Sequence, residues 1–191
     1  MAAENNFAFP ESAHRMADIP YGGHFENCDS SSIIHDNELY NSTNGFYFKN
    51  CHDINIDNNT FDNCTNNSLE FYGDGGTKSY IENNHFLNSD KALILSPVQN
   101  PLGAGSASND NTSPMNIDIS CNLFQNNNYG IIGSGDIIDQ GNGSYTNGNK
   151  FDNNADWDLL WMDFDTTFFQ FYETFAAGSS PNYSSGNPTT T

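Results

Sequence analysis

The chain has 191 residues, of which 24 are aspartate or glutamate and only 5 are lysine or arginine, so its formal net charge at pH 7 is -19. A field of this sign repels nucleic acids and anionic membranes, and it repels polyanionic polysaccharides unless cations bridge the two. Aromatic residues make up 14% of the chain, which is too many for a disordered acidic segment, so we expect one folded domain with a real core.

Residues 1–19 precede the recognisable repeats and are expected to form a short N-terminal cap. The sequence PESAHRMAD at 10–18 predicts a short helix, because proline is favoured in the first turn of a helix. This segment has no basic region followed by an apolar stretch, so it predicts no signal peptide. No apolar run in the chain is long enough to predict a membrane span.

A repeat occupies residues 20–161. IDNNTFDN at 56–63 returns as IENNHFLN at 81–88, as ISCNLFQN at 119–126 and as TNGNKFDN at 146–153, with a fainter copy, IHDNELYN, at 34–41. The central hydrophobic residues, here called the anchors, are Leu39, Phe61, Phe86, Phe124 and Phe151. The asparagines two positions before the anchors are Asn37, Asn59, Asn84, Asn122 and Asn149. Those two positions after the anchors are Asn41, Asn63, Asn88, Asn126 and Asn153.

A repeat of about two dozen residues with short apolar alternations predicts one coil of a parallel β-helix. Strong helix formers are scarce, leucine-rich repeats need more leucines per turn, and the hexapeptides of left-handed β-helices are missing. We therefore predict an all-β fold, a right-handed parallel β-helix of about six coils. The anchors would stack in the interior. The asparagines would hydrogen-bond amide to amide as a ladder and would occupy corners with left-handed backbone.

The pattern I-x-x-N-x-F-x-N, followed by a glycine and an apolar strand as in NGFYF at 44–48 and YGIIG at 129–133, resembles the repeats of the pectate-lyase-like superfamily. The resemblance covers about residues 20–161 and implies the fold. It implies no single function, because that superfamily includes polysaccharide lyases, glycoside hydrolases, epimerases, phage tailspikes and non-catalytic surface proteins.

The catalytic motifs of the enzymes in that superfamily have no clear match here. The lyases generally pair calcium-binding acids with a basic residue that abstracts a proton, but Arg15 lies outside the repeats, and the lysines fall in unrelated columns. The aspartate trio and the Arg-x-Lys motif of the hydrolases have no counterpart either. We therefore lean towards a non-enzymatic protein; an enzyme of this type would be a polysaccharide lyase or a glycosidase.

One polar column contains the candidates for catalysis. The residue after each inward isoleucine should point outward, which stacks His35, Asp57 and Glu82 on consecutive coils, with Glu38 and His85 expected on the same face. Two carboxylates about 5 Å apart suit a retaining glycosidase or a hard-cation site. The plainer interpretation is a solvated polar face.

The longest interval between anchors holds an insertion, residues 96–115, which is expected to leave the coil as a loop. Residues 162–176 predict a terminal strand or an aromatic cap. Residues 177–191 are linker-like in composition.

The C-terminal end of the repeat region also carries candidate binding residues. Trp157, Trp161 and Tyr172 can stack on sugar rings, although such aromatic clusters more often seal a coil or join a neighbour. Two D-x-D pairs would place carboxylates on one strand face, either as a calcium contact or as part of an acidic surface. The pairs consist of Asp156, Asp158, Asp163 and Asp165.

The four cysteines show neither a CxxC pair nor zinc-ligand spacing. GGHFENC at 22–28 matches GFYFKNC at 45–51, which would stack Cys28 on Cys51 within the range that a disulfide tolerates. Two reduced thiols are the alternative. Asn-x-Ser/Thr sequons, a weak indication of a glycoprotein, occur at Asn41, Asn58, Asn63, Asn66, Asn111, Asn142 and Asn182.

These observations predict a non-enzymatic extracellular or cell-surface protein that assembles with copies of itself or with other surface proteins, as in a sheath, a filament, a surface layer or an adhesin. Because the net charge opposes close packing, we expect cations, calcium in particular, to bridge the subunits. The alternatives are a carbohydrate-active β-helix and a carbohydrate-binding module, with polysaccharide as the partner.

Overall fold

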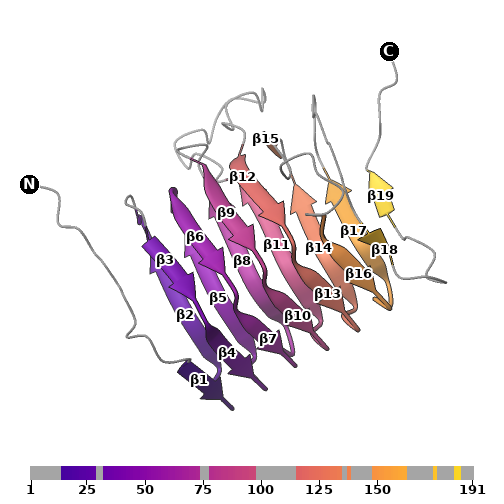
Figure 1. The fold of residues 1–191 in the computed structure, drawn as a ribbon, viewed down its shortest axis with the longest axis horizontal. Helices are drawn as coiled ribbons and strands as arrows, with labels where there is room; N and C mark the ends of the chain where they lie inside the picture. Colours follow the sequence, from indigo (N-terminus) through magenta and orange to yellow (C-terminus); the bar gives the residue numbers. More distant parts are fainter. Residues whose placement is uncertain are drawn as a thin grey trace, which may run out of the picture.

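The computed structural model describes residues 14–28, 32–73, 78–97, 115–134, 137–138, 148–162, 174–175 and 183–185. Every secondary-structure element in these residues is a β-strand. The described residues contain no helix long and apolar enough to cross a membrane. The strands form three sheets of parallel strands, named A, B and C below, and successive coils lie side by side along one axis (Figure 1). The predicted all-β parallel β-helix is confirmed.

Sheet A contains β1 (His14–Ala17), β4 (Asn37–Tyr40), β7 (Thr60–Asp62), β10 (His85–Leu87), β13 (Leu123–Gln125), β16 (Lys150–Asp152) and β18 (Thr174–Phe175). Sheet B contains β2 (Tyr21–Glu26), β5 (Asn44–Lys49), β8 (Asn67–Gly73), β11 (Lys91–Pro97), β14 (Tyr129–Ser134), β17 (Trp157–Met162) and β19 (Tyr183–Ser185). Sheet C contains β3 (Ser32–His35), β6 (Ile54–Asp57), β9 (Ser79–Glu82), β12 (Met115–Ser120) and β15 (Ile137–Ile138).

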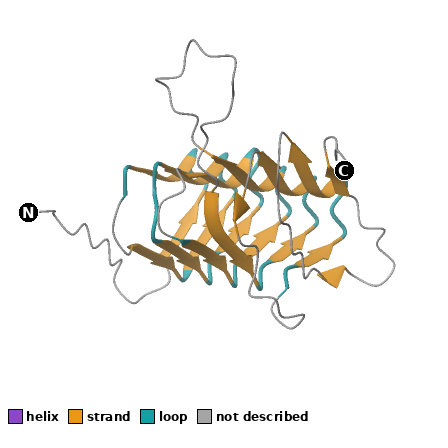
Figure 2. Ribbon diagram, turned by 90° about the horizontal axis from the view of Figure 1, so that it is seen from above, coloured by secondary structure: helices purple, strands orange, loops and turns teal. Residues whose placement is uncertain are grey.

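Each coil runs from sheet A through sheet B to sheet C, and layers of strands lie on opposite sides of the interior (Figure 2). Within the described residues, five coils place a strand in all three sheets, and two further coils place strands in sheets A and B. The number of coils therefore differs slightly from the predicted six.

Two segments near the ends differ from their predicted structure. His14–Ala17, within the predicted helix, form strand β1, because they pair in register with Asn37–Tyr40. Tyr183–Ser185, within the linker-like tail, form strand β19 beside β17. Residues 10–13 of the predicted helix and most of the insertion, residues 98–114, lie outside the described residues.

The anchors form a continuous column in the interior, as predicted. All five are at most 1% exposed. From Phe61 to Phe151 the rings stack with centroids 4.9–5.1 Å apart and with interplanar angles of 4–11°. This spacing follows from the separation of about 4.8 Å between hydrogen-bonded strands, so the sheet itself sets the ring stacking.

The asparagines before the anchors form a buried ladder, which confirms the prediction. Asn37, Asn59, Asn84 and Asn122 each donate from Nδ2 to Oδ1 of the asparagine on the next coil, at 2.9, 3.0, 3.0 and 2.8 Å. Their main-chain N–H groups donate to the same oxygens at 2.9–3.1 Å. The ladder therefore satisfies amides that neither water nor the sheets could reach.

The asparagines after the anchors turn the chain and also hydrogen-bond from coil to coil. They have positive φ angles of 53–59°, and they lie at exposed corners. A second left-handed corner precedes the buried ladder, at Asp36, Asn58, Asn83 and Cys121. Asn63 Nδ2 donates to Asn41 Oδ1, and Asn153 Nδ2 donates to Asn126 Oδ1, both at 2.8 Å. The asparagines before the anchors thus form a buried ladder, whereas those after the anchors both turn the chain and bond to one another at the surface.

Gly45 permits close contact between two coils. A Cβ atom at this position would lie 1.9 Å from the main-chain oxygen of Ser68 on the next coil. We expect Gly45→Ala to lower the free energy of unfolding by about 1–3 kcal/mol or more, because only main chain can move away. Urea unfolding followed by circular dichroism measures this effect.

Gly23→Ala is the matched control, because its added Cβ would meet side-chain atoms of Phe25 at the half-buried first coil. Equal losses of stability for the two variants would contradict the proposed main-chain clash.

Candidate functional site

The three catalytic candidates form one column on sheet C. His35, Asp57 and Glu82 are direct Cα partners on β3, β6 and β9. Their side chains nevertheless bond to other groups. His35 Nδ1 lies 2.8 Å from Asp36 Oδ2, Asp57 Oδ1 accepts from Asn83 Nδ2 at 2.9 Å, and Glu82 Oε1 accepts from Ser120 Oγ at 3.2 Å. The column has the hydrogen bonding of a polar face that ties neighbouring coils together.

Glu38 and His85 lie in a different sheet from this column, so the predicted single face is wrong. Both are on sheet A, on opposite sides of Thr60 in the register. The left-handed residue between each sheet C strand and the following sheet A strand turns the chain at this point. Alternation along a strand does not continue through such a corner.

Among the candidates at the C-terminal end, the described pair Asp156 and Asp158 differs in exposure. Asp156 is exposed, whereas Asp158 is 5% exposed and accepts a hydrogen bond from Asn154 Nδ2 at 2.8 Å. Trp157 is half-buried beside Tyr129 in the register. Trp161 is placed only through its main chain in β17, and Asp163, Asp165 and Tyr172 lie outside the described residues.

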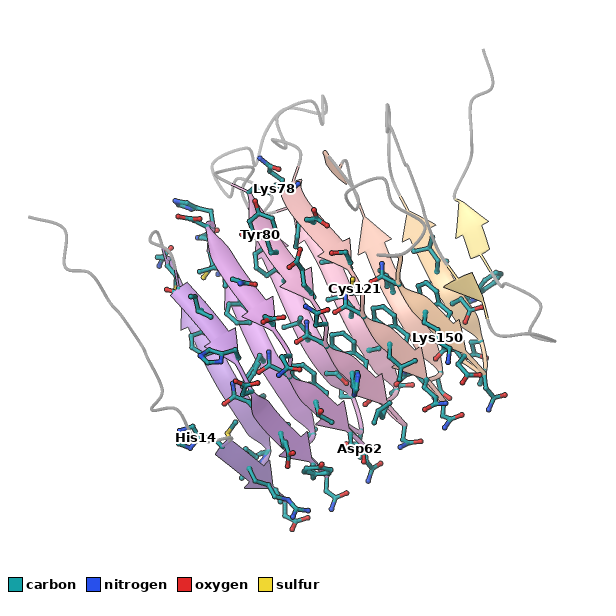
Figure 3. The ribbon with its side chains drawn as sticks, viewed as in Figure 1. His14, Asp62, Lys78, Tyr80, Cys121 and Lys150 are labelled. Atoms are coloured by element: carbon teal, nitrogen blue, oxygen red, sulfur yellow. The ribbon has the colours of Figure 1, made fainter. Side chains whose placement is uncertain are left out.

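The described residues contain no group of three or more His, Cys, Asp or Glu side chains that could hold a metal ion together. Acidic side chains are instead dispersed over the coils. Lys78 pairs with the buried Asp118 at 3.2 Å and lies over the ring of Tyr80, on the outside of sheet C (Figure 3).

A row of rings on the outer face of sheet B was missed by sequence analysis. His24, Tyr47 and Tyr72 come from the consecutive strands β2, β5 and β8, with ring centroids 4.6 Å apart for the first pair and 5.5 Å apart for the second. We call these three residues the aromatic row. In the strand register His24 lies opposite Tyr47, whereas Tyr72 lies opposite Lys49 and its ring meets that of Tyr47 diagonally, so the row follows no single column of the repeat. The alternation of the inward residues Phe46 and Phe48 with outward residues is the sequence signal that could have found it.

Charged groups border the aromatic row. Tyr72 Oη donates to Glu70 Oε2 at 3.2 Å, and burial, reinforced by the charge of Glu70, raises the pKa of Tyr72 to about 12. Glu26 lies 3.1 Å from His24 Nε2 and 3.8 Å from Lys49 Nζ. The hydrogen bond from His24, helped by Lys49, lowers the pKa of the Glu26 carboxyl. Flat rings beside hydrogen-bonding groups can bind a polyhydroxylated ligand.

The raised pKa of Tyr72 predicts a loss of stability in alkali. Between pH 10.0, the ordinary value, and about 12 the folded chain keeps a phenol proton that the unfolded chain has released, so stability falls as pH rises through this window. Glu70→Gln should move the pKa of Tyr72 back towards 10.0, because it removes the neighbouring charge.

The titration is measured by tyrosinate absorbance in the unaltered chain and in Glu70→Gln. Subtracting the absorbance of the same chain carrying Tyr72→Phe isolates the contribution of Tyr72. An unchanged titration in Glu70→Gln would show that burial alone raises the pKa.

Cys28 and Cys51 are stacked on neighbouring coils as predicted, and both are free thiols. The main-chain N–H of Cys28 donates to Cys51 Sγ at 3.4 Å. Cys51 is buried and Cys28 is half-buried, and burial raises the pKa of the Cys51 thiol to about 12. The disulfide between them stays a prediction. Cys64 and Cys121 are also thiols outside any disulfide, in two other columns of the solenoid.

Comparison with known proteins assigns the family. The model of one family, described as periplasmic copper-binding protein (NosD), matches residues 2–159. No curated protein and no solved structure matches the chain. The matched residues include all five anchors and both asparagine columns, which build the solenoid. With most of its length matched in this way, the chain belongs to the NosD family.

Proposed function

We propose that this protein is a non-enzymatic β-solenoid that acts outside the cytoplasm, as a rigid scaffold that binds partners along its faces. The periplasmic description of its family supports the location. One observation supports the scaffold role. The residues that repeat from coil to coil form the interior ladder, the anchor column and the corners. The side chains that differ from one coil to the next therefore face outward, as expected of a scaffold whose faces bind partners.

The finer proposal is a subunit of a surface layer, sheath, filament or adhesin, assembled through its ends. The core residues Met16 and Phe25 of the first coil are only partly buried, whereas Leu39 and Phe48 on the next coil are fully buried. Strands β1, β2 and β3 are the edges of their sheets. Exposed edges of this kind pair readily with another chain. Cations such as calcium would offset repulsion between two chains of charge -19.

Electron microscopy and sedimentation velocity on the purified chain test this proposal, first with calcium and then with a chelator. Filaments, tubes or sheets that dissolve in the chelator would support cation-bridged assembly. A single monomeric species under both conditions would rule out self-assembly through the ends.

A second candidate function is carbohydrate binding, which the aromatic row favours. Its rings follow one another across three strands, with Tyr72 offset from the other two, and they are bordered by Glu26, Lys49 and Glu70. A panel of neutral oligosaccharides, tested by calorimetry, should bind to the unaltered chain and not to the variant Tyr47→Ala/Tyr72→Ala. Tyr80→Ala is the matched control, because Tyr80 is an exposed tyrosine on sheet C (Figure 3). Equal binding by all three proteins would exclude the aromatic row.

The family description adds copper to this proposal. The described residues do not fit a divalent copper site made from several histidines, because no three ligands are gathered among them. The stacked thiols of Cys28 and Cys51 fit monovalent copper, since soft thiolate ligands select that ion. We therefore extend the proposed function to binding of monovalent copper.

A further inference from the structure

We propose that Cys28 and Cys51 together bind one monovalent copper ion as a two-coordinate site in the first two coils of the solenoid. This inference rests on the copper-binding part of the proposed function and names its site. Neither residue contributes to the asparagine ladder or the anchor column.

The main chain holds the two cysteines opposite each other. On one side of the pair, Asn27 N–H donates to Lys49 O at 2.9 Å, and Asn50 Nδ2 donates to Asn27 Oδ1 at 3.1 Å. On the other side, His52 N–H donates to Cys28 O at 3.1 Å. The hydrogen bond from Cys28 N–H to Cys51 Sγ, at 3.4 Å, shows that the sulfur of Cys51 turns towards the neighbouring coil.

The spacing of the coils suits a bridging ion. Neighbouring strands are about 4.8 Å apart. A bond between a thiolate and a metal of this size is about 2.3 Å long, so two such bonds in a line span about 4.6 Å. The same spacing lies within the Cα range that a disulfide tolerates, so the reduced pair can hold an ion between its sulfurs and the oxidised pair cannot.

The surroundings of the pair also suit a soft ion. Cys51 belongs to the apolar core, and Cys28 packs against it, so few hard ligands compete for the ion. Cys28 is only half-buried, which provides an entry path from solvent. On binding, both thiols release their protons to water, and the site keeps one net negative charge.

The two other cysteines serve as internal controls. Cys64 lies in a buried column with Ser42 and Ser89, so serine is compatible with its position. Cys121 is exposed at the corner between β12 and β13 (Figure 3). Neither shares a column of the described coils with another cysteine.

The test uses the full chain, fully reduced and without oxygen, with monovalent copper supplied from a competing chromogenic chelator. Native mass spectrometry counts the bound ions, and circular dichroism checks the fold. We expect one ion per chain in the unaltered protein and in Cys64→Ser/Cys121→Ser, and none in Cys28→Ser. Cys51→Ala is a second test that leaves no hydroxyl in the core. Monovalent silver, which is inert to redox change, should give the same pattern.

Alkylation mapped by peptide mass spectrometry gives a readout at each residue. Bound copper or silver should protect Cys28 from alkylation and should leave Cys121 reactive. Retention of the ion by both Cys28→Ser and Cys51→Ala, or its loss from Cys64→Ser/Cys121→Ser, would overturn the site while leaving copper binding intact. Failure of the reduced, unaltered chain to compete for copper would overturn both the site and the copper-binding part of the proposed function.

Discussion

Asn84→Ala is expected to lower the free energy of unfolding by about 3–5 kcal/mol, because a buried group left without a hydrogen bond costs about 1–3 kcal/mol and this change affects several. Asn84 is fully buried in the middle of the ladder. Its Nδ2 donates to the carbonyls of Ile56 and Glu82, both at 2.8 Å. Its Oδ1 accepts from the main-chain N–H of Asn59 at 2.9 Å and from the side chain of Asn59 at 3.0 Å.

Urea unfolding followed by circular dichroism measures the change, and Asn88→Ala is the matched control. Asn88 is an exposed corner asparagine with φ 53°, and its side chain bonds to Asp62 at 2.7 Å. Alanine at that corner should cost about 1–2 kcal/mol, because the left-handed backbone is penalised and the hydrogen bonds that are lost are exposed to water. If the two variants lose the same stability, the buried ladder contributes no more than the corners do.

Phe86→Ala should have a comparable effect, a loss of about 3–5 kcal/mol, through a different physical cause. Phe86 is fully buried, and its ring stacks between those of Phe61 at 5.1 Å and Phe124 at 4.9 Å. Alanine would leave a cavity that the stiff coils above and below cannot close, and both neighbouring rings would lose a contact face.

Phe86→Leu separates packing from ring stacking. The chain itself places Leu39 in the anchor column, fully buried, so leucine is compatible with the position. We expect a loss of about 1–2 kcal/mol for this variant. Calorimetry and urea unfolding give both values. A loss as large as that of Phe86→Ala would mean that ring stacking, rather than the volume filled, stabilises the column.

The asparagine ladder and the anchor column give the interior a structural role rather than a binding role. The ladder and the anchors recur in five successive coils, so their side chains are committed to one another. The residues that differ, such as the aromatic row on sheet B and the stacked cysteines, lie on the outer face or in the first two coils. Variants of the aromatic row should change binding with little change in stability, whereas Cys51→Ala also removes a buried side chain from the core.

The sequence by itself determines the features of this protein that repeat from coil to coil. Each coil returns the chain to the same place one strand spacing further along, so a residue at a fixed position in the repeat meets its own equivalents. The asparagine ladder, the anchor column and the pairing of Cys28 with Cys51 could therefore be predicted without coordinates. The strand at His14–Ala17 could not, because its segment carries none of the repeat and becomes a strand only by pairing with β4.

Tertiary structure alone decided which columns share a face. One left-handed residue at Asp36, Asn58 or Asn83 separates sheet C from sheet A, and so separates Glu82 from His85, although only two residues lie between them. The aromatic row depends on the registers of β2, β5 and β8 at once, and its residue types differ from coil to coil, so no repeated letter marks it. A sequence repeat predicts contacts between residues at the same position of successive coils. Contacts between residues at different positions of the repeat depend on how each corner turns the chain.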